Sequence, residues 1–224
     1  GAGKSSVASV YAYAAALRGE ASTVFLFDER PDTFIHRSIG IGLDIGPHLE
    51  SGRITLRQIN TAEVTPGEFT EMICKDVHAR GVKVVVIDSL TGYMSAMPNE
   101  RQLVTQMHDI LSYLSGQGVL SILIVAQHGV LGSGLAGPVD VSYLADTVLL
   151  LRHFEAEGEI RQAISVFKRR YGPHEKRIRM LRISSQGVEV GEPIEGFSGV
   201  LTGTPSFTGQ RAELLDRHDT RGES

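Results

Sequence analysis

The sequence predicts an α/β fold in which a mostly parallel, twisted sheet is flanked by helices and followed by antiparallel strands toward the C-terminus. Short, continuously apolar runs alternate with helical segments as far as residue 126, which is typical of parallel strands buried on both faces. From residue 147 onward the pattern changes to strands joined by short turns. The chain has 224 residues, of which 42% are hydrophobic, and this is enough for one large domain with its own core.

Helices and strands alternate in the first part of the chain. An alanine-rich segment over residues 4–18 predicts a helix that ends at Gly19, and the apolar run T-V-F-L-F over 23–27 predicts a buried strand. Pro31 suits the first turn of a second helix, which we expect to run to Arg37. The same signals predict, in order, a strand over 53–59, a helix over 66–80 stopped by Gly81, a strand over 83–87, a helix from Asn99 to Gly116 or Gly118, and a strand over 119–126.

Strands dominate the remainder of the sequence. They are predicted over residues 147–154, 159–170, 177–183 and 188–190, without helices between them. This pattern indicates an antiparallel extension on a parallel core. We therefore expect one domain over residues 1–190 and an exposed C-terminal tail over 191–224.

The opening residues G-A-G-K-S-S match the end of a phosphate-binding loop, G-x-x-x-x-G-K-[ST]. In such a loop, backbone N–H groups approach the phosphates, Lys4 reaches the β- and γ-phosphates, and the Ser5 hydroxyl binds Mg²⁺. The residues that we assign to nucleotide binding here are Gly1, Ala2, Gly3, Lys4, Ser5 and Ser6. An ordinary helix start is the alternative for these residues taken alone. Because the first glycine of the loop would precede residue 1, we expect the sequence to be one domain of a longer polypeptide.

Acidic residues follow two of the predicted strands. The run V-V-V-I-D over 84–88 has the form of a Walker B strand, whose Asp88 would hold magnesium through a water or through Ser5. Asp28 and Glu29 end the strand over 23–27, and the carboxyl ends of parallel strands face the ligand crevice of an open sheet. Each acid alone is an ordinary turn residue. Together with Lys4, they predict a site for ATP and Mg²⁺.

Two cations stand at the end of the predicted strand 159–170. With a side-chain period of two, Lys168 and Arg170 would share one face with Ile164 and Val166. From the pattern alone, a solvated strand edge explains these cations equally well.

The charge and the cysteine count limit the other function classes. A formal net charge of −4 gives no general attraction to nucleic acid or anionic lipid, and residues 128–146 contain no Lys or Arg for phosphate contacts. The single cysteine, Cys74, cannot form an intrachain disulfide. No apolar run approaches the ~18 residues that a membrane span needs. We therefore expect a cytoplasmic protein with no nucleic-acid or membrane partner.

These motifs resemble the KaiC-like family of RecA-type P-loop ATPases. The resemblance covers nearly the whole chain. The pattern is most similar to the second of the two tandem KaiC domains, or to single-domain KaiC-like proteins. The segments that carry it are V-V-V-I-D-S-L at 84–90, L-A-D-T-V-L-L-L at 144–151, E-G-E-I-R-Q-A-I-S-V-F-K-R-R at 157–170, G-P-H-E-K at 172–176 and F-S-G-V-L-T-G-T-P at 197–205. It implies a RecA-like core that slowly hydrolyses ATP at the subunit interfaces of a ring, usually a hexamer. The implied setting is signalling or circadian-type regulation through partner proteins.

The resemblance also implies roles for individual residues. Asp28 and Glu29 match the family's paired catalytic glutamates. Because aspartate is one methylene shorter, we rank Glu29 above Asp28 as the base. Lys168 and Arg170 match cations that reach the γ-phosphate bound by the neighbouring subunit. Arg161 matches another interface cation more loosely.

Two further residues acquire expected roles from the same resemblance. Gln127 follows a strand where RecA-type proteins place a polar sensor of the γ-phosphate. Ser142 occupies the first position of an autophosphorylation pair whose second position is Tyr143 here, so Ser142 is a candidate phosphoacceptor. Simple packing of Ser142 and Tyr143 near the interface is the alternative.

Two other functions stay open. One is a RecA/DnaB-like DNA-dependent ATPase on the same core, which the lack of cations over 128–146 disfavours. The other is a non-catalytic scaffold, in which ATP holds a ring together without being turned over. The scaffold function stays an alternative because Asp28 stands where the family has a glutamate.

Overall fold

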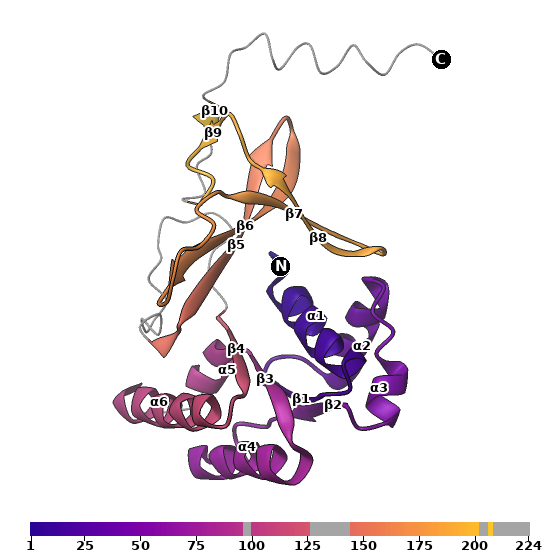
Figure 1. Ribbon diagram of the computed structural model, residues 1–224, viewed down its shortest axis with the longest axis vertical. Helices are drawn as coiled ribbons and strands as arrows, with labels where there is room; N and C mark the ends of the chain where they lie inside the picture. The colour runs from indigo at the N-terminus through magenta and orange to yellow at the C-terminus, as the bar shows by residue number, and fades with distance from the viewer. Residues whose placement is uncertain (96–99, 126–143, 202–205, 208–224) are drawn as a thin grey trace.

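The computed structural model describes residues 1–95, 100–125, 144–201 and 206–207, which form a helix-flanked parallel sheet and an antiparallel sheet (Figure 1). The helices are α1 (Lys4–Leu17), α2 (Pro31–Gly40), α3 (Gly46–Glu50), α4 (Pro66–Arg80), α5 (Leu90–Ser95) and α6 (Glu100–Gly116). The strands are β1 (Ala21–Leu26), β2 (Ile54–Gln58), β3 (Val82–Asp88), β4 (Leu120–Ile124), β5 (Thr147–Ala156), β6 (Glu159–Arg169), β7 (Arg179–Ser184), β8 (Gly187–Pro193), β9 (Phe197–Ser198) and β10 (Ser206–Phe207). The predicted fold class, a mixed α/β core of the RecA-like P-loop type with an antiparallel extension, is confirmed.

The parallel sheet has the strand order β2-β1-β3-β4. Its register places Leu26, the last residue of β1, beside Asp88, the last residue of β3. The carboxyl ends of these two neighbouring strands therefore meet at one edge of the sheet. Residues that directly follow β1 are brought to Asp88 by this register alone.

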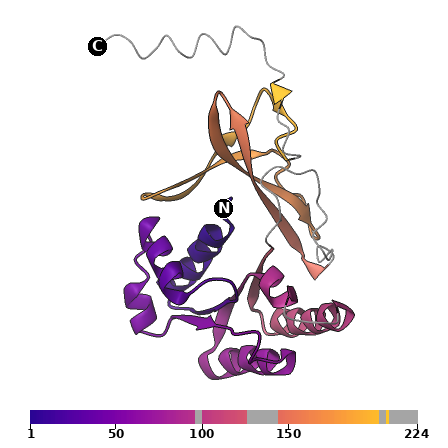
Figure 2. The same cartoon turned by 180° about the vertical axis from the view of Figure 1, so that it is seen from behind.

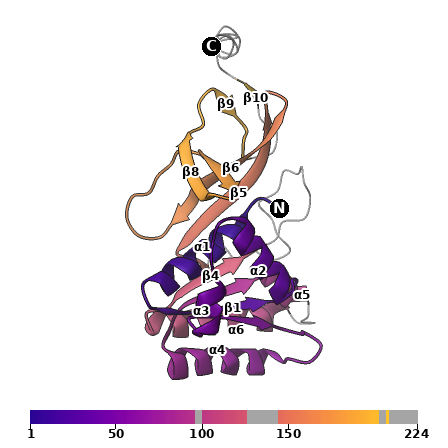
Figure 3. The same cartoon turned by 90° about the vertical axis from the view of Figure 1, so that its right-hand side faces the viewer.

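Both faces of the parallel sheet are covered, as the apolar strands predict (Figure 3). Alternate residues of β1 and β3, such as Phe25 and Val85, pack with α4, α5 and α6. The intervening residues, such as Val24 and Val86, pack with α1, α2 and α3. The small side chains of α1 let this helix lie close to the sheet, and the buried ones include Ala8, Ala12, Ala15 and Ala16.

Helix α4 begins and ends at the residues that the sequence predicts. Thr65 and Glu68 form a capping box, with the Glu68 N–H donating to Thr65 Oγ1 over 3.3 Å and the Thr65 N–H donating to Glu68 Oε2 over 2.7 Å. Pro66 occupies the first helical turn, and Gly81 follows the helix in the left-handed conformation. The short helices α3 and α5 were not predicted, because neither has the length to show a helical period.

The antiparallel sheet has the order β5-β6-β7-β8 and lies over the N-terminal end of α1 (Figure 1, Figure 2). Ile183 of β7 and Val188 of β8 pack against the core that α1 and α2 share with the parallel sheet. Strand β8 runs across the predicted boundary between residues 190 and 191. Val200 is 1% exposed and joins a small core with Phe154 and Ala163. Residues beyond 190 thus contribute to the packing of this sheet.

The pairing of β5 with β6 corrects the expectation about the face of β6 on which Lys168 lies. Lys168 lies opposite Val148 and Val166 lies opposite Leu149, so an extra residue is inserted in β6 between these two pairs. Because Val148 and Leu149 are successive on β5, they point to opposite faces, and so do their partners. The prediction that Lys168 shares a face with Ile164 and Val166 is therefore wrong, and the bulge is the reason.

None of the helices in the described part of the chain combines the length and the apolar character that crossing a bilayer requires.

Candidate active site

The turn before α1 is shaped by Gly3, which caps the helix with a φ of 92°. A Cβ at this position would lie 2.3 Å from Ile183 Cδ1 of β7, so both the backbone conformation and the close packing require glycine. The carbonyl of Gly3 accepts the first helical hydrogen bond, from the Val7 N–H over 2.9 Å. Among the residues that the structure describes, no side chain caps the helix, so its first N–H groups can receive an anion. Ser6 is buried in the first turn of α1.

Two cations converge at this turn. Burial lowers the pKa of Lys4, the neighbouring Arg152 guanidinium lowers it further, and Asp88 opposes both effects. Arg152 comes from β5, and its Nε is buried with no hydrogen-bond partner among the described residues. Two partly buried cations at a helix N-terminus favour a bound anion. Sequence reasoning missed Arg152, because nothing in the run L-L-L-R-H-F indicates that this strand lies over the turn.

Asp88 and Ser5 are joined at the carboxyl edge of β3. The Ser5 hydroxyl lies beside the Asp88 carboxylate, which is 9% exposed. Burial raises the pKa of Asp88, the Ser5 hydroxyl opposes this, and the nearby Glu29 and Asp28 carboxylates raise the pKa further. The Asp88 Oδ2 atom is buried and has no partner in the described part of the chain.

These residues fit magnesium bound together with phosphates. Among the described residues, no group of three or more His, Cys, Asp and Glu side chains could hold a metal ion by itself. Mg²⁺ usually takes one or two protein oxygens, several waters and the phosphates of a substrate. The orphaned Asp88 Oδ2 beside the Ser5 hydroxyl supplies such oxygens.

Asp28 is held against the start of α5. The Ser89 hydroxyl donates to Asp28 Oδ2 over 2.5 Å and accepts from the Gly92 N–H over 3.2 Å. A Cβ at Gly92 would lie 2.4 Å from Asp28 Oδ1, so the carboxylate lies directly on the glycine backbone. One Asp28 oxygen is thus engaged by Ser89, and both lie close to α5. Ser89 and Gly92 were not predicted to belong to the site.

Glu29 is held from the other side, by α2. Arg37 Nη1 donates to Glu29 Oε2 in an ion pair. The Arg37 guanidinium also lies over the ring of Phe34, 5.1 Å from its centroid. Glu29 Oε1 is buried without a hydrogen-bond partner among the described residues. Arg37 also lies near enough to Asp88 to oppose the rise in the pKa of that carboxyl, which burial mainly causes.

Five predicted residues thus converge from three segments of the chain, and they are Lys4, Ser5, Asp28, Glu29 and Asp88. The other predicted cations lie elsewhere. Arg170 Nη1 pairs with Asp146 Oδ1 at 3.0 Å, next to the end of β6 where Lys168 stands. Arg161 stands at the opposite end of β6, roughly 23 Å from Lys168 along the strand. Gln127 and Ser142 lie outside the described residues.

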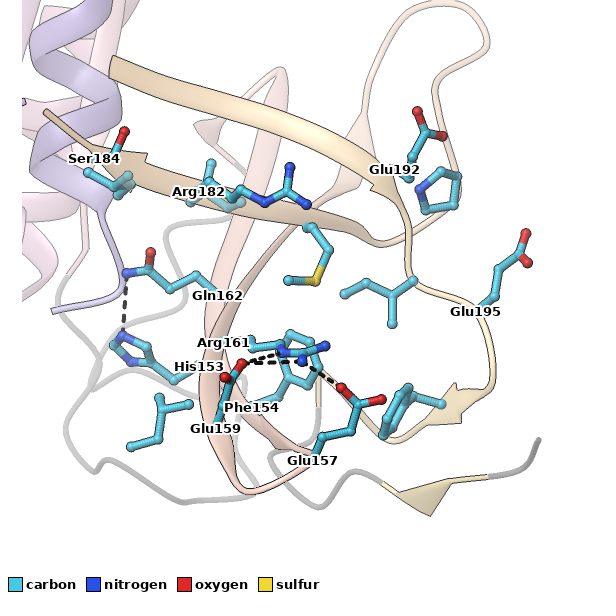
Figure 4. A pocket seen from close by; sticks show the side chains of 17 residues that line it. His153, Phe154, Glu157, Glu159, Arg161, Gln162, Arg182, Ser184, Glu192 and Glu195 are labelled. Atoms are coloured by element: carbon cyan, nitrogen blue, oxygen red, sulfur yellow. Dashed lines mark hydrogen bonds and ion pairs between the residues drawn. The ribbon is translucent and has the colours of Figure 1, made fainter. Parts of the chain in front are cut away.

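A groove of about 1050 Å³ runs along the antiparallel sheet (Figure 4). Leu181 and Ile183 line it and also contact the position of Gly3, so one end of the groove adjoins the turn before α1. At the other end, Arg161 pairs with Glu157 at 2.6 Å and with Glu159 at 3.2 Å (Figure 4). The charge of Arg161 is therefore balanced within its own hairpin.

Comparison with known proteins identifies the family. A family model described as "ATPase: KaiC" matches residues 1–195. The chain is 27% identical to circadian clock protein KaiC3 of Synechocystis sp. over 94% of this chain and 41% of the relative. It is 30% identical to KaiC2 of the same organism, over 91% of this chain and 36% of the relative, and 24% identical to the circadian clock oscillator protein KaiC of Thermostichus vulcanus, over 92% and 40%. The chain spans about two fifths of the length of these relatives. Since the family model covers most of its residues, the chain belongs to the KaiC family of ATPases.

Proposed function

We propose that this chain binds ATP with Mg²⁺ at the turn before α1 and hydrolyses it slowly. The observation that carries the proposal is the convergence of Lys4, Ser5 and Asp88 with the carboxylates of Asp28 and Glu29. The backbone of Gly1, Ala2 and Gly3 and the first N–H groups of α1 receive the phosphates. Lys4 and Arg152 balance their charge. The end of the groove beside Gly3 offers room for the nucleoside.

The proposed reaction uses Glu29 as the general base. Glu29 Oε1 accepts a proton from water, the water oxygen attacks the γ-phosphorus, and the bond to the β-phosphate oxygen breaks so that ADP leaves with the electron pair. Asp88 and Ser5 would hold the magnesium ion, which would neutralise phosphate charge. Asp28 is ranked second as the base, because Ser89 already occupies one of its oxygens.

The site is proposed to be completed by a neighbouring copy in a hexameric ring. Lys168 and Arg170 then act on the nucleotide of the adjoining subunit and stabilise the transferred charge. The end of β5 and β6 that carries these cations suits such a contact, because Leu149, Phe167 and Tyr171 are exposed near it. A head-to-tail contact of this kind must close into a ring or continue as a filament.

Regulation is the proposed setting of this activity. The relatives are named circadian clock proteins, and we extend that description to a signalling or circadian-type role with regulatory protein partners. In the proposed autokinase reaction, the Ser142 hydroxyl accepts the γ-phosphoryl group of ATP, and water does not. Mass spectrometry after incubation with ATP tests it, and a Ser142→Ala chain should lose the added phosphate.

The test of the main proposal is ATP turnover by the purified full chain with Mg²⁺. Lys4→Ala should lower turnover roughly 100-fold, because a cation aimed at the phosphates is lost. Lys75→Ala is the matched control, since the Lys75 side chain is 72% exposed and pairs with Glu71 on the surface of α4. Equal turnover in the unchanged and Lys4→Ala chains would refute the proposal. Assembly with ATP but no phosphate release would indicate a scaffold.

A further inference from the structure

We propose that Arg37 is a positioning residue for ATP hydrolysis, which fixes the Glu29 carboxylate so that one of its oxygens faces the attacking water. This inference rests on the proposed function and names a residue beyond it. The geometric basis is the ion pair between Arg37 of α2 and Glu29, which lies in the turn after β1. Arg37 touches neither substrate nor metal in this scheme and acts through Glu29.

The pair uses only one of the two carboxylate oxygens. Arg37 Nη1 donates to Glu29 Oε2, and Glu29 Oε1 stays buried without a hydrogen-bond partner in the described ranges. A buried acceptor with no partner costs free energy, and a water positioned for attack would relieve that cost. The ion pair therefore separates an anchored oxygen from one that can take a proton.

Arg37 is itself held in place. Its guanidinium lies over Phe34, one turn earlier on α2, and Phe34 is 2% exposed in the core beneath the helix. The ion pair is about three-quarters shielded from solvent, with side-chain exposures of 25% for Arg37 and 20% for Glu29. A long arginine side chain is thus restrained on a helix that packs against the sheet. Such rigid support is what a general base needs, because small displacements of a reacting group strongly reduce rate.

Asp28 and Glu29 are adjacent in the sequence but are held in place at different helices. Asp28 is held by Ser89 and lies on Gly92 of α5, whereas Glu29 is held by Arg37 of α2. The anchors lie on opposite sides of the sheet, because α5 packs into one core and α2 into the other. Adjacent carboxylates are thereby kept apart in spite of their like charge.

The experiment measures kcat and KM for ATP in the full chain with Mg²⁺, for Arg37→Ala, Arg37→Lys and Arg30→Ala. Arg37→Ala should lower kcat roughly 10- to 100-fold and leave KM within about threefold, because phosphate contacts are untouched. Arg37→Lys should retain part of the rate. Added guanidinium at millimolar concentration should restore part of the Arg37→Ala rate, because it can occupy the vacated place beside Glu29. Arg30→Ala is the matched control, since Arg30 is 78% exposed and its nearest acidic atom, on Asp32, is 4.0 Å away.

The outcomes separate this inference from the proposed function. If the unchanged chain and Lys4→Ala turn over ATP equally, the proposed function fails. If Glu29→Gln abolishes turnover but Arg37→Ala keeps the unchanged kcat, only the inference fails. If Arg37→Ala loses rate, gains nothing from guanidinium and melts at a clearly lower temperature than Arg30→Ala, Arg37 is structural and the inference is overturned.

Discussion

The Ser5 hydroxyl lies close enough to the Asp88 carboxylate to lower the pKa of that carboxyl, and this proximity joins the first turn of α1 to the carboxyl end of β3. The proximity of Ser5 and Asp88 unites two motifs that are far apart in the sequence. Asp88 Oδ2 is buried and has no partner among the described residues, at the place where the proposed magnesium ion needs an oxygen. The predictions below follow from this arrangement and from the side chains that surround it.

The two neighbouring acids should differ in importance. Glu29→Gln should lower turnover roughly 100-fold or more, because the amide cannot accept the proton, and a general base contributes about 10²–10⁴-fold. Asp28→Asn should have a smaller effect, because its carboxylate is already engaged by Ser89. The rate of ATP hydrolysis measures both. A larger loss in Asp28→Asn would reverse the ranking.

A methyl group at Gly92 should disturb Asp28. Gly92→Ala places a carbon 2.4 Å from Asp28 Oδ1 and should destabilise the chain by about 1–3 kcal/mol in urea denaturation. In an Asp28→Ala background the same change should be neutral or stabilising, because the obstructing oxygens are gone and alanine suits a helix better than glycine. Gly67→Ala in α4 is the matched control, since a Cβ there meets nothing within 4 Å. If Gly92→Ala lowers the free energy of unfolding equally in both backgrounds, a clash with Asp28 is not the cause.

Arg152 should contribute to nucleotide affinity. Arg152→Met keeps much of the apolar stem but removes a cation that lies near Lys4, so ATP and ADP should bind about tenfold more weakly, as the loss of a charge-assisted contact predicts. Titration with a fluorescent nucleotide measures the change. Arg53→Met, at an exposed arginine before β2, should bind normally. If Arg152→Met binds ATP and ADP as tightly as the unchanged chain, Arg152 does not contribute to nucleotide binding.

Subunit mixing tests whether Arg170 acts in trans. A Lys4→Ala chain and an Arg170→Ala chain should each be nearly inactive alone. Co-assembled, they should regain part of the activity, because some interfaces would combine an intact Lys4 turn with an intact Arg170 from the next subunit. The turnover of the mixture measures this. If the mixture is no more active than its components, Arg170 does not act across an interface.

Asp76 of α4 should make stability depend on pH. Burial raises its pKa, but hydrogen bonds from Arg57 and Thr23 and the charges of Arg57 and Arg80 outweigh this, so the net pKa is lowered. A carboxyl with a lowered pKa stabilises the fold above its unfolded-state pKa of about 4, and this contribution is lost as the pH falls through its folded-state pKa.

Substitution isolates that contribution. Asp76→Asn should destabilise the chain by about 2–4 kcal/mol at neutral pH, because the side chain is 3% exposed and the hydrogen bonds from Arg57, of 2.6 and 2.9 Å, are weakened. It should also flatten the loss of stability below pH 4. Urea midpoints across pH 3 to 7 measure both effects. If the urea midpoints of the unchanged and Asp76→Asn chains fall in parallel as the pH is lowered, groups other than Asp76 cause the loss of stability in acid.

Much of the fold could be predicted from the sequence, because buried parallel strands and their helices leave local signals. The apolar runs that became β1, β3 and β4 mark strands covered on both sides, and Pro66 with Gly81 marks the ends of α4. The phosphate loop and the acids after two strands could also be predicted, because parallel strands end at one edge. Their convergence required only that β1 and β3 be neighbours.

The sequence by itself determined the longer helices, the main strands, the family, and the acids and the lysine expected at the proposed nucleotide site. Only the tertiary structure decided which other side chains reach them. Arg37 meets Glu29 because α2 folds back beside β1, and Arg152 reaches Lys4 because the antiparallel sheet lies over the turn at Gly3. The bulge in β6 turned Lys168 away from the face that strict alternation predicts. Such contacts depend on the register and packing of segments distant in sequence, and a local pattern carries no signal for them.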